Sequence, residues 1–218
     1  MGCEQMLSPY RDGSPLDAPL ELDQLPSSRE WEGQIAYLDR DGVLNVGSDE
    51  YVNAPEDVVL LPGADTALGR LRRAGFRICV VTNQSPIGRG HWGHENLSDI
   101  HQRLRSILQS GDDDAVLDLI LYSPYAPWEN SWARKPNPGM LEAGRQLLDS
   151  ANSNTESGSR ILYDREWLDR PDESTSVLVG DRHADMGAAE SHGVRGIRCD
   201  SSLGLASVVD SILGDGNG

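Results

Sequence analysis

Short apolar runs that end in polar or acidic residues alternate with amphipathic stretches from residue 34 onward. Strands are predicted at 34–39, 76–81, 116–122, 176–180 and 194–198, and the run at 34–39 has the composition of a buried strand. Helices are expected between and after them, at 63–74, 94–109, 140–148, 183–192 and 204–213. Strands that alternate with helices form right-handed crossovers. The sequence therefore predicts an α/β chain with a mostly parallel sheet and helices on both faces.

Polar side chains gather where the predicted strands end. A parallel sheet places its ligand site beyond the carboxyl ends of its strands. The polar residues at those ends are Asp39, Asp41, Thr82, Asn83, Asp181 and Asp185. We expect these side chains to converge on one crevice.

Asp39 and Asp41 flank Arg40 in a predicted tight loop. Residues i and i+2 of such a loop can face one ligand while the residue between them points away. One carboxylate can then attack an electrophile while the other exchanges a proton with the leaving group. The segment is also compatible with an ordinary turn, because Asp-Gly is a common turn dipeptide.

Asp181 and Asp185 are four residues apart at the start of a predicted helix, so they share one helix face. One interpretation is capping of the helix N-terminus. The other is binding of Mg²⁺, which prefers oxygen ligands. If Asp39 shares their crevice, capping alone does not explain so many carboxylates, because like charges in a dry cleft need a cation.

Hydrogen-bond donors and fixed positive charges complete the expected site. The segment 82–85 supplies a hydroxyl and turn amides that suit phosphoryl oxygens. Arg134 and Lys135 add two cations, and Lys135 is the only lysine among 19 basic residues. A compact ammonium can neutralise both a nucleophilic carboxylate and a developing phosphoryl charge.

Four segments in this order resemble the haloacid dehalogenase superfamily of aspartyl-phosphate phosphatases, at 37–45, 81–90, 134–141 and 179–186. Within it the chain is similar to the heptose-bisphosphate phosphatase and histidinol-phosphatase subfamily. The resemblance covers roughly residues 34–200. It implies a three-layer, Rossmann-like α/β fold with minimal cap loops and a Mg²⁺-dependent phosphatase.

The resemblance also implies a role for each site residue. Asp39 would be the nucleophile and Asp41 the general acid and base, while Thr82 and Lys135 would stabilise the phosphoryl group. Mg²⁺ would be held by Asp39, the backbone carbonyl of Asp41 and Asp181, with Asp185 in support. The residues expected to bind substrate are Asn45, Asn83, Ser85, Arg89 and Arg134.

The segment 122–133 departs from the subfamily pattern, which usually includes a zinc loop of three Cys and one His. Those places are taken here by Ser123, Tyr125, Ser131 and Ala133. A structural zinc needs four Cys or His ligands, so no zinc is predicted. The loop instead carries three aromatic residues, Tyr125, Trp128 and Trp132. We favour a packing role for them; the alternative is that one or two line the mouth for a sugar or cyclitol substrate.

The net charge of −16 opposes a general nucleic-acid binder, because a phosphate backbone is held mainly by Lys and Arg. The sequence has no apolar run long enough for a membrane-spanning helix and no secretory signal pattern. The three widely spaced cysteines suit a reducing compartment. The five histidines lack metal-ligand spacing, which favours surface or helix-cap positions for each. We expect a cytoplasmic protein, either a monomer or a dimer, that binds neither nucleic acid nor membrane.

Residues 1–33 are rich in Pro, Ser, Asp and Glu and are interpreted as a partly disordered N-terminal extension. The phosphatase domain is expected over 34–214, with a polar loop at 150–159 and a tail at 215–218. The predicted activity is hydrolysis of a small sugar or cyclitol phosphate through an aspartyl-phosphate. Two alternatives stay open, a polynucleotide 3′-phosphatase and a non-catalytic binding protein with the same fold.

Overall fold

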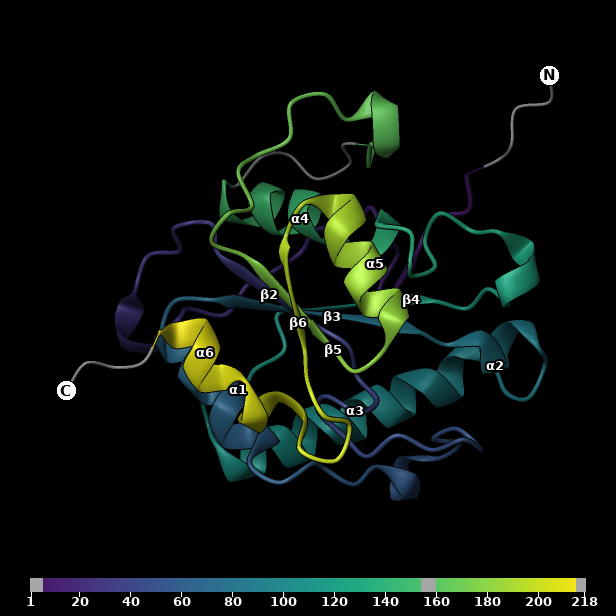
Figure 1. The fold of residues 1–218 in the computed structure, drawn as a ribbon, viewed down its shortest axis with the longest axis horizontal. Coiled ribbons are helices and arrows are strands. Elements are labelled where there is room, and N and C mark those ends of the chain that lie inside the picture. Colours follow the sequence, from purple (N-terminus) through teal and green to yellow (C-terminus); the bar gives the residue numbers. More distant parts are fainter. Residues whose placement is uncertain (1–5, 154–159, 215–218) are drawn as a thin grey trace.

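A six-stranded sheet forms the centre of the protein (Figure 1). The computed structural model describes residues 6–153 and 160–214. The strands are β1 (Tyr10–Arg11), β2 (Ile35–Leu38), β3 (Arg77–Asn83), β4 (Leu119–Ser123), β5 (Val177–Gly180) and β6 (Arg195–Arg198). Their order is β1-β4-β3-β2-β5-β6, and every neighbouring pair is parallel except β1 with β4. The predicted mostly parallel α/β sheet is confirmed.

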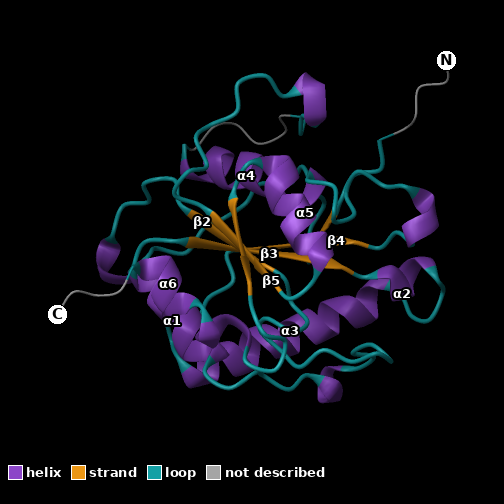
Figure 2. Cartoon of the chain, in the orientation of Figure 1, coloured by secondary structure: helices purple, strands orange, loops and turns teal. Residues whose placement is uncertain are grey.

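Helices cover both faces of the sheet (Figure 2). They are α1 (Ala64–Arg73), α2 (Ser85–Gly88), α3 (His94–Gly111), α4 (Gly139–Asn152), α5 (His183–His192) and α6 (Val209–Leu213). Helices α4 and α5 lie on one face, and α1, α3 and α6 lie on the other. The predicted terminal helix at 204–213 is divided into a 3-10 turn (Gly204–Ser207) and α6. The short helix α2 was not expected.

Two apolar cores explain why the segment of β2 is apolar at every position. Ala36 and Leu38 of β2 pack with α1 and α3, whereas Ile35 and Tyr37 pack with α4 and α5. A strand covered on both faces buries consecutive side chains, in contrast to the alternating pattern of a half-exposed strand. The three-layer arrangement therefore follows from the uninterrupted apolar runs.

Residues 6–33, interpreted from sequence as part of an extension, lie against the domain in the structure. Residues of β1 pair with β4, and Leu25 is buried. The guanidinium of Arg77 donates a 2.6 Å hydrogen bond to the Asp23 carbonyl, and that of Arg72 donates a 3.0 Å bond to the Gln24 carbonyl. These contacts fix the segment by its backbone oxygens.

Two other predicted segments are described in part. The polar loop expected at 150–159 begins as the last turn of α4, and residues 154–159 lie outside the described part of the chain. The predicted tail at 215–218 also lies outside it. Across residues 6–153 and 160–214, none of the helices combines the length and apolar character needed to span a membrane.

Candidate active site

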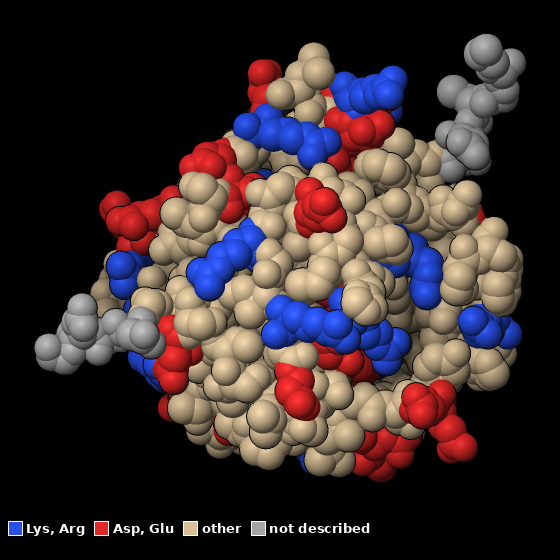
Figure 3. Space-filling model, in the orientation of Figure 1, with Lys and Arg blue, Asp and Glu red and all other residues tan. Residues whose placement is uncertain are grey.

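The carboxyl ends of the central strands meet, as the sequence predicts. The register places Leu38 of β2 beside Val80 of β3 and Val179 of β5, so the residues that follow these strands are neighbours. The Asp39 amide donates a 2.9 Å hydrogen bond to the Val179 carbonyl. A cavity of about 330 Å³ opens there, lined by predicted site residues including Asp39, Asp41, Thr82, Asn83, Ser85, Arg134, Lys135 and Asp185. Basic side chains (Lys and Arg) cross the centre of the face shown in Figure 3, with acidic side chains beside them.

Lys135 lies between two acidic side chains at the base of the cavity. Its Nζ is 3.0 Å from Asp39 Oδ1 and 2.5 Å from Asp185 Oδ1, and the residue is only 3% exposed. Burial lowers the pKa of Lys135, but the two carboxylates more than offset this effect and leave the pKa above its usual value. The ammonium therefore stays charged beside these two carboxylates.

Burial raises the pKa of Asp39 to about 6. Lys135 opposes this shift, and the nearby carboxylates of Asp185 and Asp41 add to it. The Asp39 carboxylate is weakly solvated, and Lys135 offsets only part of the effect of burial on its pKa. The carboxylate has two ways to stay ionised near neutral pH. It can keep its ion pair with Lys135, and it can bind a cation.

Asp41 is held by donors that leave little freedom to its carboxylate. Arg40 donates from Nε to Oδ1 at 3.0 Å and from Nη2 to Oδ2 at 2.8 Å. Asn45 donates a 2.9 Å bond to Oδ1, and Gln84 donates a 3.3 Å bond to Oδ2. Burial raises the pKa of Asp41, but the charge and hydrogen bonds of Arg40 and the other donors outweigh burial and lower it.

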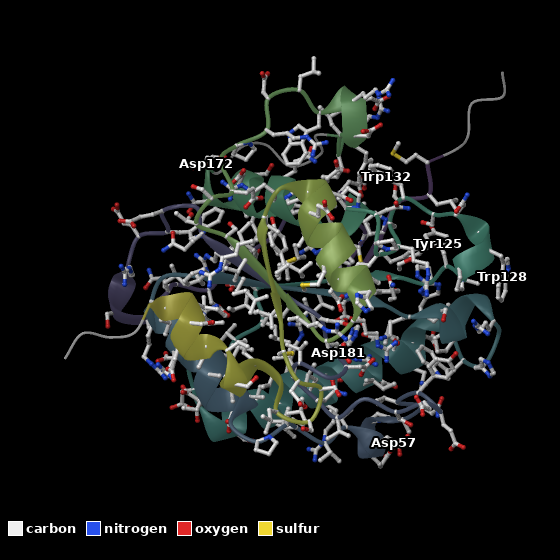
Figure 4. All side chains as sticks on the ribbon, in the orientation of Figure 1. Asp57, Tyr125, Trp128, Trp132, Asp172 and Asp181 are labelled. Carbon is white, nitrogen blue, oxygen red and sulfur yellow. The ribbon has the colours of Figure 1, made fainter. Side chains whose placement is uncertain are left out.

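Three carboxylates form a group that could hold a metal ion. Oxygens of Asp39, Asp181 and Asp185 lie within 4.8 Å of one another, and the part of the chain that the structure describes contains no second such group of His, Cys, Asp or Glu. Asp181 Oδ1 is buried and has no hydrogen-bond partner among the residues that the structure describes. Asp181 lies between the end of β5 and the start of α5 (Figure 4). An all-carboxylate set with an unsatisfied oxygen fits a hard divalent cation such as Mg²⁺.

Asp185 makes two contacts in the structure, one at the start of α5 and one with Lys135. Its Oδ2 accepts a 3.0 Å bond from the Arg182 amide at the start of α5, which is helix capping. Its Oδ1 pairs with Lys135. Asp185 therefore anchors the helix and at the same time contributes charge to the cavity.

Asn83 and Arg134 shape the cavity through backbone contacts. The Asn83 side chain donates to the Lys135 carbonyl at 3.0 Å and accepts from the Lys135 amide at 3.1 Å, which fixes that residue beside the strand end. Arg134 Nη1 donates a 3.0 Å bond to the Tyr125 carbonyl. The Thr82 hydroxyl accepts a 2.9 Å bond from Gln84.

Two of the expected substrate-binding residues lie elsewhere. Asn45 is 1% exposed and sits behind Asp41, so its contact is with that carboxylate. Arg89 is exposed, and its guanidinium stacks over the Trp128 ring at 5.0 Å. Neither residue is among those that line the cavity.

Sequence reasoning missed the role of Arg40, which was expected only to point away from the ligand. Arg40 is 1% exposed and makes the bidentate contact with Asp41. The signal was present, because an arginine inside an apolar strand-and-loop segment must be buried with a partner. The expectation of surface or cap positions for the histidines is wrong for His101, which is 0% exposed and faces Asp12.

The aromatic residues of the segment 122–133 mostly pack. The Tyr125 hydroxyl donates a 3.0 Å bond to the Ser8 carbonyl, and the Trp132 indole donates a 2.7 Å bond to Glu142. Ser131 donates to the Leu7 carbonyl at 3.3 Å. Trp128 is 70% exposed at the margin of the molecule (Figure 4). The packing interpretation therefore describes Tyr125 and Trp132.

Comparison with known families identifies the chain. The family model described as polynucleotide kinase 3 phosphatase matches residues 34–163, and the one described as HAD-hydrolase-like matches residues 132–202. A heptose-1,7-bisphosphate 7-phosphatase of Thermosynechococcus vestitus is 34% identical over 182 residues, which cover 77% of this chain and 79% of the relative. The chain belongs to the haloacid dehalogenase superfamily of phosphatases. The predicted resemblance is confirmed.

Other members of the superfamily agree with this assignment. The corresponding phosphatase of Pseudomonas putida is 40% identical over 110 residues, 50% of this chain. That match spans 62% of the relative's length. The crystal structure of the D,D-heptose 1,7-bisphosphate phosphatase of Bordetella bronchiseptica, in complex with magnesium and phosphate, superposes with a TM-score of 0.61 at 25% identity. It covers 82% of this chain and 99% of that one.

Proposed function

We propose that this member of the haloacid dehalogenase superfamily is a Mg²⁺-dependent phosphomonoesterase that acts on a small sugar or cyclitol phosphate. The observation that carries the proposal is the cavity lined by Asp39, Asp41, Lys135 and Asp185, with the Asp181 carboxylate close to those of Asp39 and Asp185. Heptose bisphosphate phosphatases among its relatives support a phosphorylated sugar as the substrate class.

In the first step, Asp39 attacks phosphorus in line with the leaving oxygen. The bond between phosphorus and that oxygen breaks, and the leaving alcohol takes a proton held at Asp41. An aspartyl-phosphate forms on Asp39. Lys135 and the donors around Thr82 stabilise the charge on the equatorial oxygens, because they already face the cavity before the reaction.

In the second step, Asp41 takes a proton from water and the water oxygen attacks phosphorus. Inorganic phosphate leaves, and the Asp39 carboxylate is regenerated. The lowered pKa of Asp41 supports this half of the cycle, because an ionised carboxylate is ready to accept the proton.

The proposed Mg²⁺ ligands are Asp39, the Asp41 backbone carbonyl and Asp181, with Asp185 in support. When bound, Mg²⁺ would supply positive charge against the phosphoryl oxygens and the clustered carboxylates. The segment 122–133 offers no four Cys or His ligands, so the proposal includes no zinc.

Arginines at the mouth of the cavity support an anionic substrate that extends beyond one phosphoryl group. Arg134 and Arg182 both line the cavity, together with Tyr51. Burial, and then the positive charge of Arg89, lower the pKa of Arg134. Two guanidinium groups beyond the phosphoryl position favour a second negative group on the substrate.

A second candidate is a polynucleotide 3′-phosphatase, which the match of residues 34–163 to that family model supports. The net charge of −16 opposes it, because a nucleic-acid backbone would be repelled over most of the surface. We therefore place it second.

The decisive experiment is a phosphate-release screen with Mg²⁺ over sugar, heptose, cyclitol, nucleotide and 3′-phosphorylated oligonucleotide substrates. Asp39→Asn is the matched variant, since it removes the nucleophile and keeps the shape. We expect turnover of a sugar or cyclitol phosphate by the natural chain and none by Asp39→Asn. Preferred turnover of the oligonucleotide, falling steeply with salt, would favour the second candidate. Equal rates for the two proteins would reject the mechanism.

A further inference from the structure

A line of side chains connects the N-terminal segment with Asp41 through the protein interior. Asp12 Oδ1 lies 3.1 Å from His101 Nδ1, and His101 Nε2 lies 3.5 Å from Arg40 Nη1. Arg40 then holds both oxygens of Asp41. Asp12 follows β1, His101 belongs to α3, and Arg40 follows β2. Three separate parts of the sequence thus meet behind one carboxylate.

The middle of this line is shielded from water. His101 and Arg40 are buried, and the side chain of Asp12 is largely so. A buried guanidinium requires partners for its N–H groups, because unpaired donors are costly in an apolar interior. Arg40 donates to Asp41 from Nε and Nη2, and its Nη1 faces the ring of His101.

The donor chemistry fixes the direction of the line. A guanidinium can only donate, so His101 Nε2 must accept from Arg40. The proton of a neutral ring then resides on Nδ1, where it faces the Asp12 carboxylate. Burial lowers the pKa of His101, and Arg40 adds to this effect against the opposing Asp12, which supports a neutral ring.

The backbone holds Asp12 in place for this contact. Its amide donates a 3.0 Å hydrogen bond to the Ile120 carbonyl, which continues the pairing of β1 with β4. The neighbouring Tyr10 ring stacks on His94 with centroids 4.7 Å apart. Arg105 provides a second, more exposed partner for Asp12 at 3.4 Å.

We propose that Asp12 is a positioning residue for Asp41, acting through His101 and Arg40. The carboxylate of Asp12 fixes the tautomer and orientation of His101. His101 in turn fixes Nη1 of Arg40, the guanidinium nitrogen that does not contact Asp41. Arg40 then presents Asp41 to the leaving oxygen in one orientation. The inference rests on the proposed phosphatase function, in which Asp41 exchanges the proton of the leaving group.

A positioning role predicts a signature that simple anchoring of the N-terminal segment would not produce. A sugar alkoxide needs a proton in order to leave, whereas a nitrophenolate leaves readily without one. A misplaced Asp41 therefore slows sugar phosphate hydrolysis far more than aryl phosphate hydrolysis. A general loss of folded protein would lower both rates equally.

The test compares Asp12→Asn with the natural chain on nitrophenyl phosphate and on the best sugar phosphate from the screen. We expect kcat to fall about tenfold on the sugar phosphate and to stay within about twofold on the aryl phosphate, with KM unchanged. His101→Asn should give the same pattern. The double variant should lose no more than either single one, because both interrupt one line of contacts.

Two control variants separate positioning from folding. Arg11→Gln removes the hydrogen bonds of the segment to the Ala18 and Pro19 carbonyls, and Arg105→Gln removes the exposed partner of Asp12. Both should keep the natural ratio of the two rates. Equal losses on the two substrates in Asp12→Asn and His101→Asn, or no loss in either, would overturn the inference. A natural chain inactive on both substrates would instead reject the proposed function.

Discussion

The ammonium of Lys135 lies 3.0 Å from Oδ1 of Asp39. Both residues are buried, so the attraction between them is screened far less than it would be at the surface. Burial raises the pKa of Asp39, and the charge and hydrogen bond of Lys135 oppose the shift. The only lysine of the chain thus supports ionisation of the carboxylate proposed as the nucleophile.

Lys135→Arg should lower kcat on the sugar phosphate by roughly 100-fold, as expected when a preorganised charge contact is lost. A guanidinium is longer and planar, and it cannot occupy the enclosed position between Asp39 and Asp185. Steady-state kinetics tests this, with the reverse exchange at exposed Arg165 as a control. Near-normal turnover of Lys135→Arg would show that the single lysine reflects codon usage alone.

Mg²⁺ affinity should increase as the pH rises toward about 6 and then level off, because the pKa of Asp39 in the metal-free protein is about 6. Below that pH the proton competes with the cation, so affinity should change by about tenfold per pH unit. Titration calorimetry between pH 5 and pH 8, in buffers of different ionisation enthalpy, would also detect the released proton. A flat affinity over this range would remove Asp39 from the ligand set.

Gly42→Ala should weaken Mg²⁺ binding by about tenfold or more, as changes behind metal ligands commonly do. Gly42 has a φ of +80°, and a Cβ there would lie 2.7 Å from Asp181 Oδ2, so Asp181 would have to move. Gly193→Ala is the matched control, since φ is +91° and a Cβ would meet nothing within 4 Å. Equal Mg²⁺ affinities for the two variants would contradict a ligand role for Asp181.

Glu173→Ala should destabilise the fold by about 3–5 kcal/mol, the usual effect of removing one partner of a buried charge pair. Glu173 is buried, accepts a 3.0 Å bond from the Tyr37 hydroxyl and lies 3.1 Å from His192 and 3.4 Å from Arg145. Urea unfolding at pH 7 measures the change. Exposed Glu190→Ala should stay within about 0.5 kcal/mol, and a similarly small change in Glu173→Ala would refute the prediction.

The central sheet was predictable because burial on both faces leaves a strong pattern. Apolar runs such as residues 35–38 have no polar position, and the polar residue that follows each run marks the strand end. Since parallel strands end at one edge, the convergence of Asp39, Thr82 and Asp181 follows from the pattern alone.

The contacts that hold residues 12–24 and Asn45 in place were not predictable in the same way. Hydrogen bonds from Arg72 and Arg77 to the backbone carbonyls of residues 23–24 leave no trace in the sequence, because every residue has a carbonyl. The contact between Asp12 and His101 depends on which strand β1 joins. Asn45 has a side chain suited to substrate, and only the loop geometry turns it toward Asp41.

The smallest strand has a consequence for how separate molecules behave. Tyr10 and Arg11 of β1 pair with Tyr122 and Leu121 and so cover the outer side of β4, whose residues are all buried. An uncovered apolar strand offers free N–H and C=O groups to any other extended chain. A chain without its first twelve residues would therefore be prone to self-association. The two residues of β1 are enough to keep β4 from being the exposed edge of the sheet.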